Sequence, residues 1–173
     1  CKILADLGLD HVLTSLPSSD PLINDQIMQK VGAFELIMDG IAAARRNNIR
    51  VSVNHVVSLA NYQSVYETAK KVAEVGGQKI FITKAVPPTY SKDPEKDGYI
   101  TDPKKMKEAL DAALEAKKDF GISVGTLVSY PLCFLGDLEK YKDFIGRGCP
   151  GQRGTRFSVN STGETHACVH EEK

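Results

Sequence analysis

Apolar residues in this chain follow two spacings in turn, one typical of β-strands and one typical of helices. Segments rich in β-branched and alternating apolar residues occur at residues 11–16, 49–58, 78–86 and 122–130. Helical spacing recurs between these segments, which is typical of a parallel sheet covered by helices. The sequence therefore predicts an α/β fold, either a doubly wound sheet or part of a TIM-like (β/α) barrel.

Helices are expected where apolar residues recur three and four positions apart. The first spans residues 33–48, the second runs from an N-cap at Asn61 to Gly76, the third starts at Asp102 and Pro103, and a short fourth is capped by Asp137. The third helix should bury Met106, Leu110 and Ala113. Polar loops are expected at residues 17–26 and 89–101.

Composition narrows the class of protein without identifying it. The 173 residues are 42% hydrophobic and 25% charged, which is enough for a globular domain with a sizeable core. Lys plus Arg equals Asp plus Glu at 22 each, so no charge excess favours nucleic acid or a membrane surface. Neither a membrane span of roughly 20 apolar residues nor a signal segment is present, which indicates the cytoplasm. Because Cys1 opens what resembles a helix already under way, we expect a fragment.

Polar residues stand at the carboxyl ends of the predicted strands, where α/β proteins bind ligands. These residues are Ser15, Asn54 with His55, and Lys84. Each could instead satisfy neighbouring backbone groups. No glycine-rich phosphate loop follows any strand, which argues against nucleotide binding of the Rossmann or P-loop kind.

The cysteines near the carboxyl end have the spacing of a metal site. Cys149, Gly163 and Cys168 are separated by 13 and 4 residues. Residues 156–168 alternate apolar and polar side chains around a Ser-Thr-Gly turn, so a β-hairpin should bring the second thiol back toward the first. Paired thiolates suit an iron–sulfur cluster or zinc. Both could also be ordinary buried thiols.

Several segments together resemble radical S-adenosylmethionine (radical SAM) enzymes with a SPASM extension, which modify peptides. They are LADLGLDHVLTSL at 4–16, GAFELIMDGI at 32–41, VSVNHVV at 51–57 followed by Asn61, KAVPP at 84–88, and the cysteine-bounded segment 149–168. The resemblance covers most of the chain, and the cysteine spacing is its most specific part.

The resemblance implies a domain division and a set of ligands. Residues 1–130 would be the second half of a partial barrel, and residues 131–173 would begin a SPASM region with a cluster-binding hairpin. Ser15 and Asn54 would contact S-adenosylmethionine. Cys149, Cys168 and Cys133 would hold part of an auxiliary 4Fe-4S iron–sulfur cluster, although Cys133 could instead end an apolar strand.

The same resemblance implies an enzyme that acts on a ribosomally made peptide or protein. Hydrogen abstraction by a 5′-deoxyadenosyl radical would be its chemistry. The family's C-x3-C-x2-C loop is absent, so the chain alone should be inactive and should need a missing N-terminal half. We expect that half, or a second copy of the chain, to cover the open edge of the strand at 11–16.

Two motifs depart from the family pattern, and an alternative function stays open. Ser-x-Asp-Gly reads SLPS at 15–18, and His-Asp-x-x-Arg reads NDQIM at 24–28. Met28 thus replaces an arginine that helps to hold the cofactor carboxylate, and Lys30 or another cation would have to substitute for it. The alternative is a non-catalytic module in which the cysteines bind zinc and the scaffold binds a peptide.

Overall fold

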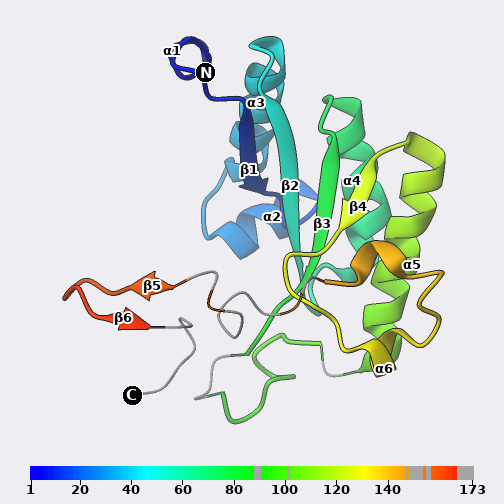
Figure 1. Cartoon of the computed structure of the whole chain (residues 1–173). Helices are drawn as coiled ribbons and strands as arrows, with labels where there is room; N and C mark the ends of the chain where they lie inside the picture. Colours follow the sequence, from blue (N-terminus) through cyan, green and yellow to red (C-terminus); the bar gives the residue numbers. More distant parts are fainter. Residues whose placement is uncertain (88–90, 101, 147, 149–153, 155–156, 167–173) are drawn as a thin grey trace.

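The computed structural model describes residues 1–173 except 88–90, 101, 147, 149–153, 155–156 and 167–173. Four strands form one parallel sheet: β1 (His11–Ser15), β2 (Arg50–Val57), β3 (Lys79–Lys84) and β4 (Ser123–Gly125). Their order in the sheet is β1-β2-β3-β4, so strands that are consecutive in the chain are also neighbours (Figure 1). A doubly wound sheet reverses its strand order at a switch point, and the described strands show no such reversal.

Helices connect the strands and cover one face of the sheet. Right-handed crossovers between neighbouring parallel strands place their helices on the same side. The connecting helices are α2 (Pro21–Met28) and α3 (Ala33–Arg46) after β1, η1 (Tyr62–Ser64) and α4 (Val65–Glu74) after β2, and α5 (Pro103–Phe120) after β3. In Figure 1, α3 and α4 lie behind the sheet, and α5 lies beside α4 at the β4 end of the sheet.

Short elements complete the chain at both ends. They are α1 (Lys2–Asp6), α6 (Leu132–Leu135), η2 (Lys142–Phe144), β5 (Ser158–Val159) and β6 (Thr165–His166). Strands β5 and β6 pair in antiparallel fashion and are separate from the main sheet. The described residues contain no helix long and apolar enough to cross a membrane.

The helix α5 forms as its sequence predicts. The side chain of Asp102 accepts a hydrogen bond from the Lys104 amide, and Pro103 occupies the first turn, where its missing N–H is not needed. The helix ends at Gly121, whose φ of 66° is in the left-handed region. The predicted inward residues Met106, Leu110 and Ala113 are all buried.

The polar loop expected at residues 17–26 is wrong in its second half, because α2 begins at Pro21. Asp20 accepts hydrogen bonds from the amides of Leu22 and Ile23, and Pro21 occupies the first turn. This is the same cap-and-proline signal as at Asp102. It went unrecognised because an eight-residue helix offers too little apolar periodicity.

The strand expected at 122–130 is shorter than predicted and ends at Gly125. The hydroxyl of Thr126 donates to the Val128 carbonyl and accepts from the Val128 amide, so this side chain replaces strand pairing with a local turn. Asp137 does accept a hydrogen bond from the Lys140 amide, but a turn and the 3-10 helix η2 follow it instead of an α-helix.

The core lies between the sheet and its helices. The sheet contributes alternate apolar residues, namely Val51, Val53, Val57, Ile80, Ile82 and Val124, all buried. Facing residues of α4 and α5, such as Val72 and Leu110, are fully buried against them.

The outer edge of β1 has no partner strand among the described residues. Beside this edge lies an apolar cavity of about 380 Å³. Residues of α1, β1 and α3 line it, including Leu4, Val12 and Ile37.

Candidate functional site

The uncovered face of the sheet carries polar side chains in register. Ser15 of β1 pairs with Asn54 of β2, and Asn54 pairs with Phe81 of β3. Side chains in one such row point to the same side of a sheet. No described helix covers this side of β1 and β2 in Figure 1. The structure therefore brings together the two residues to which the family resemblance gives a cofactor role.

A hydrogen bond fixes the orientation of the Asn54 amide. The Thr83 hydroxyl donates to Asn54 Oδ1 at 2.7 Å. Because Oδ1 accepts this bond, Nδ2 keeps two N–H donors, and neither makes a hydrogen bond to a described residue. The Ser15 hydroxyl is exposed and also makes no hydrogen bond to a described residue. The pair thus offers donors and an acceptor to a polar ligand.

A second polar pair lies nearer the start of the strands. His11 Nε2 is 2.9 Å from the Ser52 hydroxyl, across the same uncovered face. Neither Ser52 nor Thr83 was proposed from the sequence. The period-2 alternation that places Asn54 on this face would also have placed Ser52 and, through the strand register, Thr83.

The loops that follow β1 and β2 are joined by the side chain of Asn61. Its Nδ2 donates to the carbonyls of Pro17 at 2.8 Å and Val56 at 2.9 Å, and its Oδ1 accepts from the Ser58 amide at 2.7 Å. The expected N-cap contact of Asn61 is absent, since its side chain caps neither η1 nor α4. Asn61 instead fixes the two strand ends that carry Ser15 and Asn54.

His55 lies on the helix-covered face, opposite to Asn54, because neighbouring residues of a strand alternate. Its Nδ1 is 3.1 Å from the Leu16 carbonyl, while Nε2 is buried without a hydrogen-bond partner among the described residues. Burial lowers the pKa of His55 to about 4, and the Leu16 carbonyl only partly opposes this shift. His55 is therefore a neutral part of the framework below the site.

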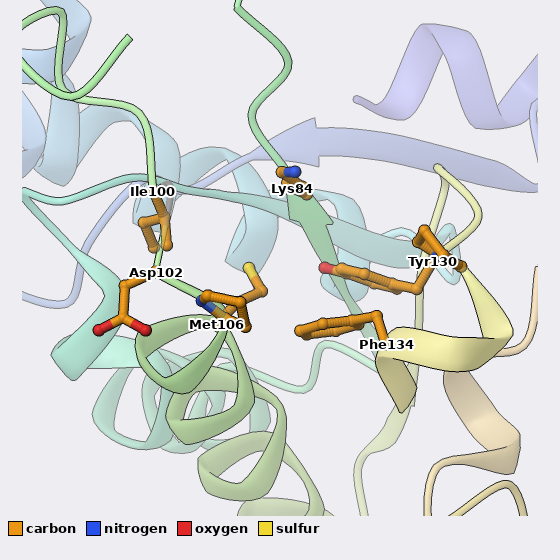
Figure 2. A pocket seen from close by; sticks show the side chains of 8 residues that line it. Lys84, Ile100, Asp102, Met106, Tyr130 and Phe134 are labelled. Atoms are coloured by element: carbon orange, nitrogen blue, oxygen red, sulfur yellow. The ribbon is translucent and has the colours of Figure 1, made fainter. Parts of the chain in front are cut away.

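Lys84, at the carboxyl end of β3, borders a cavity of about 210 Å³ (Figure 2). The other lining residues are Ile100, Asp102, Pro103, Met106, Tyr130, Pro131 and Phe134. The cavity thus lies between the end of β3, the start of α5 and the segment leading into α6.

The structure describes only one of the three cysteines assigned to a cluster. Cys133 lies on α6 with an exposed thiol, so it does not end an apolar strand. Cys149 and Cys168 lie outside the described residues. The described part of the chain contains no group of three or more potential metal-ligating side chains. Met28 ends α2 and is 43% exposed.

The fold is similar to that of SuiB from Streptococcus suis. One structure, of SuiB bound to S-adenosylmethionine, matches with a TM-score of 0.72 and 14% identity over 96% of this chain and 39% of SuiB. A second SuiB structure matches with a TM-score of 0.73 and 15% identity over 96% of this chain and 40% of SuiB. The chain thus spans about two fifths of the length of SuiB. No family model and no curated protein sequence matches the chain.

Proposed function

We propose that this chain is part of a radical SAM enzyme that modifies a ribosomally made peptide or protein. The observation that carries the proposal is the juxtaposition of Ser15 and Asn54 on the uncovered face of the sheet. It occurs in a fold shared with a protein whose structure was determined with S-adenosylmethionine bound. The sequence motifs resemble radical SAM enzymes independently of that likeness.

The residues present fit S-adenosylmethionine. This cofactor carries ribose hydroxyls and a methionyl carboxylate, which accept hydrogen bonds from an amide NH₂ or a hydroxyl. Asn54 Nδ2 and the Ser15 hydroxyl offer such donors at the carboxyl ends of neighbouring parallel strands. The Thr83 bond would hold the amide in this orientation before the ligand arrives. When bound beside a reduced 4Fe-4S cluster, the cofactor supplies hydrogen-atom abstraction.

We also propose that Cys133, Cys149 and Cys168 contribute ligands to an auxiliary 4Fe-4S cluster. The exposed thiol of Cys133 is accessible to such a cluster. The free edge of β1 and the apolar cavity beside it would be covered by a preceding part of the same protein or by a second copy. Burial of apolar surface at this edge would favour either arrangement.

Equilibrium binding of S-adenosylmethionine tests the proposal. Asn54→Ala should weaken binding about fivefold, the equivalent of one hydrogen bond of about 1 kcal/mol. The matched control is Asn47→Ala, which changes the same residue type at the end of α3 and should leave binding unchanged. Failure of the protein to bind S-adenosylmethionine, or equal affinities for the wild type and Asn54→Ala, would contradict the proposal.

A further inference from the structure

The cavity at the end of β3 has an apolar interior with a fixed aromatic wall. In Figure 2, the rings of Tyr130 and Phe134 lie on one side, while Ile100 and Met106 lie on the other. The two rings are stacked with centroids 5.7 Å apart and an interplanar angle of 27°. The Tyr130 hydroxyl donates to the Ile82 carbonyl at 3.0 Å, which holds the ring against the end of the sheet. The wall is therefore formed before any ligand binds.

The size of the cavity suits one large side chain. Its volume is about 210 Å³, whereas an apolar cavity of about 150 Å³ in another protein is large enough to bind benzene. An aromatic ring or a branched aliphatic group would contact Tyr130, Phe134 and Met106 and would leave water. A free anion without an apolar group would leave most of this interior unfilled.

The charges at the rim distinguish between ligands. Asp102 already accepts the Lys104 amide at 2.9 Å, and its negative charge lies at the positive end of the α5 dipole. Lys84 is exposed, and the described residues offer its ammonium neither an ion pair nor a hydrogen bond. Asp102 thus already has a partner in the helix terminus, whereas Lys84 is free to pair with a ligand, which favours a carboxylate next to the apolar group.

We infer that this cavity is a subsite for the peptide substrate, and that it takes an aromatic or large aliphatic side chain adjacent to Asp or Glu in sequence. The apolar side chain enters between Met106 and the aromatic wall, and the neighbouring carboxylate pairs with Lys84. The inference rests on the proposed function only in taking a peptide as the ligand. It adds to the proposed function the type of two neighbouring residues in the substrate peptide.

Methionine methyl resonances provide a direct test, because the chain has three methionines and only Met106 lines the cavity. The protein labelled with ¹³C at the methionine methyl groups is titrated with the capped dipeptides acetyl-Phe-Glu-amide, acetyl-Phe-Gln-amide and acetyl-Ala-Glu-amide. The Met106 resonance should shift with both Phe probes, with the higher affinity for Phe-Glu, and should not shift with Ala-Glu. Met28 and Met38 should stay unchanged. If the Met106 resonance does not shift with the Phe probes, or if all three methionine resonances shift equally, the inference is wrong.

Lys84→Gln tests whether the positive charge of Lys84 binds the peptide carboxylate. Because Lys84 is exposed, this substitution should not disturb the fold. It should weaken Phe-Glu binding about two- to fivefold, as expected for a solvent-exposed ion pair, and should leave Phe-Gln binding unchanged. Lys118→Gln, in the last turn of α5, is the matched control. If Lys84→Gln keeps the preference for Phe-Glu, the assignment of Lys84 is wrong. S-adenosylmethionine is absent from these titrations, so their failure and a failure of the cofactor proposal are separate results.

Discussion

Replacing Asn61 with alanine should destabilise the protein by an amount that its hydrogen bonds allow us to estimate. Asn61 is 3% exposed, and its side chain is the partner of three backbone groups in two different loops. These groups are the carbonyls of Pro17 and Val56 and the amide of Ser58. An alanine side chain can form a hydrogen bond with none of these groups. Because Asn61 is buried, water has little access to the groups left unpaired.

The need for Asn61 follows from the unequal lengths of β1 and β2. The Leu16 amide donates to the Asn54 carbonyl at 3.2 Å, on the side of β2 that faces β1. Carbonyls two residues apart in a strand point the same way, so the Val56 carbonyl also faces β1, beyond the residue where β1 has ended. Asn61 supplies the donor that a longer β1 would have supplied.

Three unpaired backbone groups at about 1 kcal/mol each give a loss of about 3 kcal/mol in the free energy of unfolding. Urea denaturation of the wild type, Asn61→Ala and Asn47→Ala measures this, with similar m-values expected for all three. Asn47 donates one side-chain hydrogen bond, to the Ala43 carbonyl at 2.7 Å, so its replacement should cost about 1 kcal/mol or less. If Asn61→Ala costs no more than Asn47→Ala, Asn61 does not join the two loops as described.

Two further predictions concern His55 and the glycines. Because burial lowers the pKa of His55 from 6.5 to about 4, the unfolded chain binds a proton at higher pH than the folded chain does. The free energy of unfolding should therefore decrease by about 3 kcal/mol as the pH falls from about 6.5 to about 4. Urea denaturation across this range should show the decrease, and His55→Gln should reduce it. A Cβ at Gly146 would clash with Ser129 Oγ and would lie 2.7 Å from Ser129 Cα, whereas one at Gly40 would meet nothing within 4 Å. Gly146→Ala should lower Tm, at a cost of about 1–3 kcal/mol, and Gly40→Ala in α3 should raise Tm; Tm shifts in the same direction would contradict this.

Much of the fold could be predicted because local signals and packing agree. The β-branched runs at 49–58 and 78–86 contain β2 and β3, and the cap at Asp102 begins α5. The predicted end of a strand is wrong where a side chain forms hydrogen bonds with the backbone. At Thr126 the hydroxyl bonds Val128, and β4 ends before it. Strand propensities of single residues do not include such a hydrogen bond.

The candidate site could be predicted only in part, for a related reason. Ser15 and Asn54 could be predicted because strand ends can be read along the chain and the family resemblance selects these two residues. The role of Asn61 depends on where β1 stops relative to β2, which is a property of two strands and not of one segment. The aromatic wall was missed because Tyr130 is held by the Ile82 carbonyl, which is far away in sequence, and Phe134 stacks on Tyr130.

The polar residues on the uncovered face of the sheet indicate what kind of space lies next to that face. Parallel strands that are packed on both faces are nearly continuous runs of apolar residues. Strand β2 interrupts such a run with Ser52 and Asn54, and β3 interrupts it with Thr83, all three on the face opposite the helices. Ser52 and Thr83 already have side-chain partners in His11 and Asn54, but an apolar layer over this face would leave the Asn54 Nδ2 donors unsatisfied. The face is therefore suited to a space with polar contents, as the inner wall of a partial barrel around a cofactor would be, and this is the arrangement that the Asn54 experiment examines.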